Sequence, residues 1–368
     1  MKNTLVCTVG TSLKLNLERQ QDEEWKQLLA LRNIKGLALK LAEIPPDERM
    51  LGAEINSISS ILNKRMLQER LSIHFLVSDT DDGRFLGKLL KEYFSLIRNP
   101  HRFEKVQYSV IEGLTDRSVT HFRTEGLRNL VREIAAIVRH AGSNTMLINA
   151  TGGYKAQISL AGLIGQVLNI PVCYLFERFS EVITLPPQPV SLDMSFWLDH
   201  AALFHTLSQD RGEENPSAKD ERFASLVDEI KTDDERLIGL SPIGQLFHEG
   251  FRYRFREQKE YLLPPDAELP PEKKEIKYED QNAEKHQGLA NWLERIREVP
   301  YVKRIYTHYY HPGLPHPKTF RPSSKGDHTK VEGIYSDGKA TTKFDVITTA
   351  SSQNECNAVL ADLLDRFC

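Results

Sequence analysis

The 368-residue sequence has little cysteine and lacks any long apolar run. Its four cysteines are far apart and form no CxxC pair: Cys7, Cys173, Cys356 and Cys368. This spacing argues against a zinc ribbon or a disulfide framework and favours a reducing compartment. No stretch approaches the roughly 20 apolar residues of a membrane-spanning helix, and the apolar run at the start is too short for a signal peptide. We therefore expect a cytoplasmic protein with no membrane partner and no bound metal.

The chain also lacks a strong charge of either sign. Its formal net charge is only -3, so the overall charge gives no reason to expect a nucleic-acid partner. Any binding site for an anion or for RNA must therefore come from local clusters of residues. At this length the chain can form two or three domains, each with its own core.

The first part of the chain alternates β-branched apolar runs with amphipathic helical patterns. The runs that predict strands are residues 4–10, 72–79, 105–113, 145–153 and 171–178. The segments between them include helical patterns at 23–44 and 124–142. Strands that alternate with helices at this spacing predict an α/β fold with a largely parallel sheet. We expect a Rossmann-like domain over residues 1–190, which ends at the proline-rich segment 184–193.

The middle and last parts of the chain have different patterns. Residues 191–259 predict two helices, the second over 219–232, then a short strand and a helix that starts at Ser241-Pro242, because serine caps helices and proline suits their first position. This order is compatible with a winged-helix-like linker or with a plain helical linker. Residues 260–286 read as a proline-rich loop.

The C-terminal segment predicts a small α+β domain over residues 260–368. A helix at 286–299 is followed by strands on either side of a polar loop, and the turn Asp337-Gly338 favours a hairpin, because glycine supplies the positive φ that a tight turn needs. Ser352 is placed to cap a final helix.

Two predicted strand ends carry residues suited to a polar ligand. The first strand ends in "VGTS" and the fourth continues into "INATGGYKAQ", with a helix directly after it. Parallel sheets bind ligands at the carboxyl ends of their strands, where helix N-termini offer free N–H groups. Neither loop matches GxGxxG or GxxxxGK[ST], so NAD or ATP binding, and with it an oxidoreductase function, is not favoured.

These two loops resemble those of the CARF domain, the CRISPR-associated Rossmann fold sensor of type III CRISPR ancillary proteins. The resemblance covers residues 1–190 and implies a homodimer that binds cyclic oligoadenylate, most often cyclic tetra-adenylate, across its two-fold axis as an allosteric activator, with no other cofactor. Carried over by position, the pocket residues are Gly10, Thr11, Ser12, Asn149, Thr151, Gly152, Gly153, Tyr154 and Lys155. Some CARF domains also cleave their ligand, and Ser12 and Lys155 would be the candidates here.

The segment 301–343 is locally basic and rich in aromatic residues. It holds eight Lys or Arg against three acids, together with tyrosines, a phenylalanine and the histidines His308, His311, His316 and His328. Basic side chains neutralise phosphates and aromatic faces stack on unpaired bases, so this composition favours an RNA surface. We expect the three histidines from 308 to 316 to contact RNA or solvent rather than a metal.

The order of elements in the tail resembles RelE-type toxins, which cleave mRNA on the ribosome without a metal. The resemblance covers residues 286–368 and implies an mRNA interferase that attacks through the ribose 2′-hydroxyl. The implied catalytic residues are Lys318, Arg321, Lys325, His328 and Lys330. Unlike those toxins, the chain has no arginine or tyrosine at the start of its last helix, where "TTASSQNECNAVL" stands.

Other functions stay open at this point. Arg321 and His328 have the R-x4-6-H spacing of HEPN ribonucleases, but that motif belongs on a helix, and "RPSSKGDH" is a poor helix former. The series Asp266, Glu275 and Lys277 faintly resembles a restriction-type nuclease. A third alternative is a winged-helix transcription regulator that responds to the same ligand, although residues 220–236 carry more acids than bases.

Overall fold

The computed structural model covers residues 1–368 and describes all of them except 177–178, 180, 189–193, 213–219, 232–235 and 324–325. The chain forms two compact units. The first comprises residues 1–191, 216–228 and 240–250, and the second comprises the remaining residues. The segment 191–259 contributes to both units, so the division into three domains stays a prediction. Among the described residues, no helix is both long and apolar enough to cross a membrane.

The first unit is built on a six-stranded sheet with the order β3-β2-β1-β4-β5-β6. Only the pairing of β5 with β6 is antiparallel, which confirms the predicted α/β fold with a largely parallel sheet. The strand β6 is an addition, because the sequence predicts a domain exit there. The strands are β1 (Thr4–Thr8), β2 (Ser72–Ser78), β3 (Lys105–Ile111), β4 (Met146–Asn149), β5 (Val172–Tyr174) and β6 (Ile183–Leu185).

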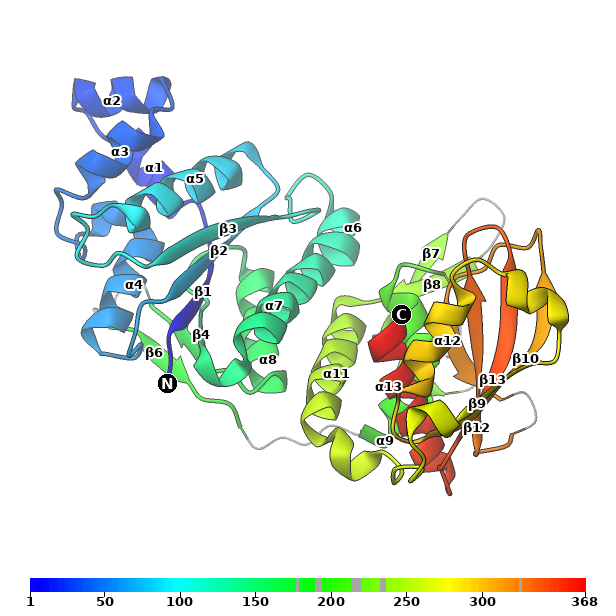
Figure 1. The fold of residues 1–368 in the computed structure, drawn as a ribbon. Coiled ribbons are helices and arrows are strands. Elements are labelled where there is room, and N and C mark those ends of the chain that lie inside the picture. The colour runs from blue at the N-terminus through cyan, green and yellow to red at the C-terminus, as the bar shows by residue number, and fades with distance from the viewer. Residues whose placement is uncertain (177–178, 180, 189–193, 213–219, 232–235, 324–325) are drawn as a thin grey trace. The chain divides into compact units, whose positions relative to one another are not determined.

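Helices flank this sheet (Figure 1). The predicted helix over 23–44 is two helices, because the Asn33 side chain accepts a hydrogen bond from the Gly36 N–H at 3.0 Å and caps a new start. A short π-helical segment, Phe122–Gly126, precedes α7. The helices are α1 (Ser12–Glu18), α2 (Glu23–Ala30), α3 (Ile34–Leu41), α4 (Gly52–Asn63), α5 (Asp81–Ser95), α6 (Val119–His121), α7 (Leu127–Ala141) and α8 (Lys155–Val167).

One large core cluster of the first unit lies on one side of its sheet, while other buried apolar residues, such as Val6, Leu76 and Ile134, lie on the side of α7. Leu5 and Cys7 from β1 pack with Phe75 from β2 and with apolar residues of α3, α4 and α5. Because side chains alternate along a strand, the intervening residues of β2 and β3 face α7 on the other side. Several of those residues are polar, which departs from the continuous apolar pattern typical of buried parallel strands.

The middle segment corrects one prediction. The expected helix over 219–232 is instead a 3-10 turn, Glu221–Ser225, followed by strand β7 (Val227–Lys231), which pairs with β8 (Arg236–Leu240). A β-branched, strand-forming stretch therefore prevails over an apolar spacing that also fits a helix. The helices α9 (Met194–Asp199) and α10 (Ala201–Ser208) precede it, and α11 (Pro242–Leu262) follows. Its predicted start is confirmed, since Ser241 Oγ accepts from the Gly244 N–H at 3.0 Å.

The second unit contains a five-stranded sheet with the order β11-β12-β13-β10-β9. Two of its strands lie where the sequence predicts loops, because the short runs "EIKY" and "TFRP" acquire strand structure only by pairing with their neighbours. The strands are β9 (Glu275–Tyr278), β10 (Val302–His311), β11 (Thr319–Pro322), β12 (Lys330–Ser336) and β13 (Thr341–Thr348). The Asp337-Gly338 turn is confirmed, with Gly338 at φ 90°.

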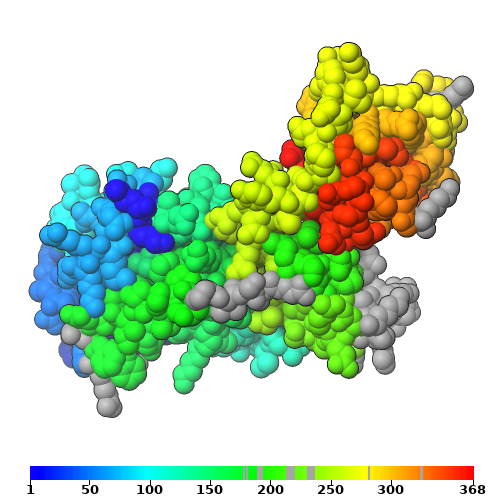
Figure 2. All heavy atoms as spheres, turned by 90° about the horizontal axis from the view of Figure 1, so that it is seen from below, coloured from blue at the N-terminus to red at the C-terminus, as the bar shows by residue number. Residues whose placement is uncertain are grey.

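Helices α12 (Leu289–Arg297) and α13 (Gln353–Phe367) bury their apolar faces in the core of the second unit. The predicted cap at Ser352 is confirmed, since its side chain accepts from the Glu355 N–H. In Figure 2, α13 (red) fills one side of this unit beside the orange strands. The opposite face of the sheet carries the polar residues of the strands.

Gly333 on β12 is a test of this packing. A Cβ atom at Gly333 would lie 2.2 Å from the ring of the buried Phe344. We expect Gly333→Ala to lower the free energy of unfolding of the second unit by about 1–3 kcal/mol through overpacking. The control is Gly162→Ala in α8, where a Cβ meets nothing within 4 Å. Calorimetric unfolding of both variants checks this, and an unchanged Gly333→Ala would contradict the packing described.

Candidate functional site

The two strand-end loops, residues 10–12 and 151–155, come together at the carboxyl ends of β1 and β4. A Cβ atom on Gly10 would lie only 2.7 Å from the backbone nitrogen of Gly153. The Thr8 hydroxyl also donates a hydrogen bond to the Gly152 carbonyl. The structure therefore joins the two loops that the sequence singles out, although they are about 140 residues apart.

The carboxylate of Glu54 lies directly beneath these loops. It accepts hydrogen bonds from the Gly10 N–H at 2.7 Å and from the Ser12 hydroxyl at 3.3 Å, and Glu54 is only 1% exposed. A Cβ atom on Gly152 would lie 2.0 Å from its Oε1. Gly152 is therefore required by the chain's own carboxylate, whatever ligand the loop receives.

Burial raises the pKa of Glu54 above its ordinary value, because desolvation penalises the carboxylate, while the hydrogen bonds from Gly10 and Ser12 oppose this shift. The sequence analysis did not identify Glu54. The available signal was weak: an acid in the helical run "GAEINSISSILN", in which Ser57, Ser59 and Ser60 are buried too. Only the folded chain shows that this polar side of α4 lies under the strand-end loops.

Two of the predicted pocket residues make hydrogen bonds to other residues of the fold. Asn149 is buried and donates to the Ser57 hydroxyl at 2.8 Å, and its Oδ1 accepts from the Thr151 hydroxyl at 2.6 Å. The Thr151 hydroxyl in turn accepts from the Leu175 N–H at 3.0 Å. These contacts fix where β4 ends and use the polar atoms that would otherwise meet a ligand.

Other residues of the loops face outward. Thr11 and Lys155 are exposed. Tyr154 makes an edge-to-face contact with Phe122, with ring centroids 5.1 Å apart. Burial raises the pKa of the Tyr154 hydroxyl, with a smaller contribution from Asp116. The outer surface of the strand-end loops therefore offers a hydroxyl, an ammonium group and an aromatic pair, of which Phe122 was not predicted.

The second unit presents a polar sheet surface, which we call the outer face. Strand pairing aligns one residue from each of its five strands in a row across it: Arg321, Glu332, Asp345, Tyr306 and Lys277. On the adjoining strands, these side chains alternate with core residues such as Phe320 and Phe344. Glu275 and Lys277, expected in a loop, therefore lie on β9.

His308 lies beside the two acids of this row. Its Nε2 is 3.7 Å from Glu332 Oε1 and 3.6 Å from Asp345 Oδ1. Glu332 also pairs with Arg321, and Lys330 Nζ is 3.8 Å from Asp345 Oδ2. In this cluster an imidazole can donate a proton, a carboxylate can accept one, and two cations can neutralise negative charge. General acid-base chemistry on a phosphate requires these three functions.

Aromatic and basic side chains border this cluster. The Arg304 guanidinium lies 5.4 Å from the centre of the Tyr306 ring, and Lys343 Nζ lies 5.1 Å from the centre of the Tyr309 ring. Part of the predicted combination of aromatic and basic groups thus lies on this surface, whereas Tyr301, Phe320 and Tyr335, predicted for the same surface, are buried in the core. The strands of this surface come from segments that the sequence alone could not align.

The residues predicted to be catalytic are divided by the fold. Arg321 and Lys330 lie in the cluster on the outer face. Lys318 instead lies over the ring of Tyr335, a core residue, at 4.7 Å. His328 is exposed, and it makes a small contribution to the lowered pKa of Asp327 and of Glu355. Lys325 lies outside the described residues. The catalytic role of all five residues stays a prediction, and Arg321, on a strand, does not meet the helical requirement of a HEPN motif.

The two remaining histidines of this segment, one at the end of β10 and one in the following loop, make local contacts. His311 accepts from the Gly313 N–H at 3.2 Å and His316 contacts the Pro317 carbonyl at 2.8 Å. Within the described part of the chain, no group of three or more His, Cys, Asp or Glu is arranged to hold a metal ion.

Comparisons with known proteins relate part of the chain to a described family. Residues 49–188 match the family described as CRISPR-associated protein (Cas_APE2256). Among solved structures, the chain is similar to Can2 from Sulfobacillus thermosulfidooxidans in complex with cyclic tetra-adenylate, at 11% identity and a TM-score of 0.22, covering 72% of this chain and 68% of that one. No curated protein matches the chain. The segment that carries Glu54 and the second strand-end loop thus matches a CRISPR-associated family.

The dependence of the strand-end loops on Glu54 can be tested by substitution. We expect Glu54→Ala to lower the free energy of unfolding by about 1–3 kcal/mol, because the Gly10 N–H loses its acceptor. Glu54→Gln is the matched control, since its amide oxygen can still accept.

The pH dependence separates charge from hydrogen bonding at Glu54. A raised pKa means that the folded state binds the proton more tightly, so the carboxylate costs stability as pH rises through that pKa. Relative to Glu54→Gln, the wild-type protein should lose stability as pH rises from the ordinary pKa of a glutamate, about 4.3, to the raised pKa of Glu54. Parallel stability curves for the two proteins would contradict the burial described here.

Proposed function

We propose that the protein is a ribosome-dependent mRNA endoribonuclease of type III CRISPR antiviral defence, activated by a cyclic oligoadenylate, most simply cyclic tetra-adenylate. The observation that carries the nuclease part is the outer face, where His308, two carboxylates and two cations meet beside stacked aromatic and basic side chains. Support for the sensor part comes from the strand-end loops and from the match of residues 49–188 to a CRISPR-associated family.

The activator would bind at the outer surface of the strand-end loops. Lys155 at the start of α8 would take a phosphate, aided by the backbone N–H groups of the first turn of that helix. The edge-to-face pair of Tyr154 and Phe122 offers an aromatic surface for an adenine. In this proposal Glu54 holds the loop backbone in place and does not touch the ligand.

The strand-end loops of one chain offer few cationic side chains to a ring of phosphates. Lys14, which follows the first loop, is already paired with Glu18 at 2.6 Å and with Asp82 at 3.2 Å. Among the residues of these loops that the structure describes, Lys155 carries a positive charge with no acidic partner. A homodimer would supply a second copy, and a symmetric ring on a two-fold axis would then meet the same surface twice.

The outer face would cleave RNA without a metal. The 2′-hydroxyl of a ribose attacks the adjacent phosphorus and forms a 2′,3′-cyclic phosphate, while the bond to the 5′-oxygen of the next nucleotide breaks. Asp345 is the more exposed of the two carboxylates, 27% against 10% for the Glu332 side chain, and would take the 2′-hydroxyl proton. His308 would protonate the leaving oxygen, and Lys330 would stabilise the charged phosphorane.

Helix α11 is the element through which the activator could influence cleavage, because it contributes its first part to the first unit and the rest to the second. In the first unit, Arg139 of α7 pairs with Glu249 of α11 at 2.6 Å. In the second unit, Arg252 and Arg256 of α11 pair with Asp365 of α13 at 2.7 and 2.6 Å. In this proposal, a shift of α7 is transmitted through the ion pairs of α11 to α13.

The transcription-regulator alternative is less well supported than the nuclease. A winged helix that binds DNA needs a basic recognition helix, but residues 227–231, expected to end that helix, form strand β7 and include Asp228 and Glu229. Ligand-dependent DNA binding with intact RNA would nevertheless favour this alternative over the nuclease.

Substitutions at the two sites should separate sensing from cleavage. We expect Lys155→Ala to weaken activator binding and abolish activation. His308→Ala should leave activator binding unchanged and lower the cleavage rate by about 100-fold or more, as loss of a general acid does. The measurement is mRNA cleavage in a translation reaction with and without cyclic tetra-adenylate, together with calorimetric binding of the activator.

The matched control is Lys91→Ala, since Lys91 is exposed on α5 and belongs neither to the strand-end loops nor to the basic segment 301–343. Cleavage by His308→Ala at the wild-type rate would exclude the outer-face mechanism. Activation that survives in Lys155→Ala would exclude the strand-end loops as the activator site.

The pairing of α11 with α13 can be tested in the same reaction. Hydrogen bonds from Arg256 and the charge of Arg252 hold the pKa of Asp365 below its ordinary value, although burial opposes this. We expect Asp365→Asn to bind activator normally but to show a several-fold smaller stimulation of cleavage. Glu257→Gln, exposed on α11, is the control. Full stimulation in a folded Asp365→Asn protein would contradict a role for this contact.

A further inference from the structure

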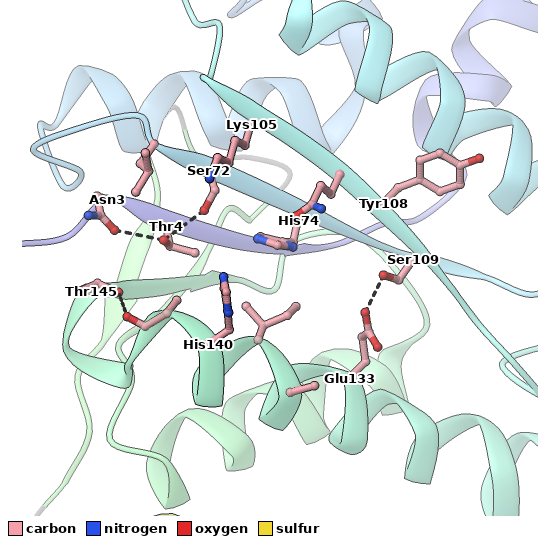
Figure 3. A pocket seen from close by; sticks show the side chains of 15 residues that line it. Asn3, Thr4, Ser72, His74, Lys105, Tyr108, Ser109, Glu133, His140 and Thr145 are labelled. Atoms are coloured by element: carbon pink, nitrogen blue, oxygen red, sulfur yellow. Dashed lines mark hydrogen bonds between the residues drawn. The ribbon is translucent and has the colours of Figure 1, made fainter.

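A second candidate site lies in the first unit, at the opposite ends of the strands from the strand-end loops. A groove of about 570 Å³ runs between α7 and the first residues of β1, β2 and β3 (Figure 3). Its volume is within the roughly 300–1,000 Å³ that small-molecule sites occupy. The groove shares no residue with the strand-end loops, so the proposed activator does not account for it.

The floor of the groove is polar because of the strand register. Thr4, Ser72 and Lys105 align in one row, and His74 and Gln107 lie side by side in the next row. A parallel sheet covered by a helix is usually apolar on that face. Here α7 instead contributes Glu133 and His140 to the wall, so the polar surface is left without a cover from the described chain.

Some of these polar groups are already satisfied. The Ser72 hydroxyl donates to Thr4 Oγ1 at 3.1 Å, and the Thr4 hydroxyl donates to Asn3 Oδ1 at 3.0 Å. The Ser109 hydroxyl donates to Glu133 Oε1 at 2.5 Å. The one carboxylate that lines the groove therefore has a fixed position and a partner.

The basic side chains of the groove have no such partner: His140 and Lys105 are exposed to solvent and His74 is half-buried. Among the residues that the structure describes, the side chains of His74, His140 and Lys105 accept no hydrogen bond, donate none and form no ion pair. Figure 3 shows both imidazoles in the space between the sheet and α7. Three basic side chains around a groove whose one carboxylate is already hydrogen-bonded favour an anionic ligand.

We propose that this groove binds a phosphomonoester of mononucleotide size. The phosphate would lie between His74, His140 and Lys105, while the free oxygen of Glu133 would accept a hydrogen bond from a ribose hydroxyl. A bare phosphate would leave most of the volume unused and would miss Glu133.

Binding should be pH-dependent. Burial lowers the pKa of His74, the charge of His140 lowers it further, and Glu133 opposes both. A bound phosphate would raise that pKa, so the complex takes up protons and affinity rises as pH falls. The other charged groups that line the groove are Lys105 and Glu133.

The test is calorimetric titration of the full-length protein with 5′-AMP at pH 6 and pH 8, with inorganic phosphate and adenosine as comparison probes. We use the Lys155→Ala protein throughout, so that the strand-end loops do not bind the probe. We expect 5′-AMP to bind more tightly at pH 6, phosphate to bind weakly and adenosine not at all. No binding of 5′-AMP at pH 6, or equal binding of adenosine, would overturn the proposal.

Variants locate the binding. The double substitution His74→Gln with His140→Gln should weaken 5′-AMP binding at least 10-fold and remove its pH dependence, while Lys91→Gln, exposed on α5, should not change it. The imidazole resonances of His74 and His140 should shift on titration. A folded double variant, judged by its circular dichroism, that binds 5′-AMP as before would overturn the proposal. None of these results bears on activator-dependent cleavage.

Discussion

The buried carboxylate of Glu54 is the interaction on which the strand-end loops depend. It accepts hydrogen bonds from Gly10 and Ser12 of the first loop and lies against Gly152 of the second. A buried carboxylate is costly unless such donors satisfy it. Both loops contact the same carboxylate. A shift of either loop would therefore displace Glu54 and disturb the contacts of the other loop. This constraint places Thr11, Tyr154 and Lys155 outward, where a ligand can reach them.

The second unit achieves a comparable result through strand register. The row from Arg321 to Lys277 exists because five strands pair with one alignment, and an irregularity between Thr307 and Tyr309 lies next to His308. The apolar residues of the same strands hold the sheet on α12 and α13. The chemistry on the outer face is therefore positioned by the core beneath it, including the close contact between Gly333 and Phe344.

Sequence patterns predict the parts of this molecule that local rules determine. β-branched runs identify the parallel strands, and Ser241-Pro242 and Ser352 mark the starts of α11 and α13. The patterns failed where the structure of a segment depends on pairing with a strand that is distant in the sequence. The strands β9 and β11 are too short and too close to proline to be recognised alone, and β7 has an apolar spacing that also fits a helix. Glu54 could not be chosen among 51 acids, because its partners lie more than 40 residues away.

The central claim is that an activator at the strand-end loops leads to mRNA cleavage at the outer face on the ribosome. The most direct measurement is to sequence RNA ends from a translating extract that contains the protein, with and without cyclic tetra-adenylate. The account predicts new ends only when the activator is present, phased to codons and confined to translated regions. Ends without codon phase, in RNA that is not being translated, would contradict the claim.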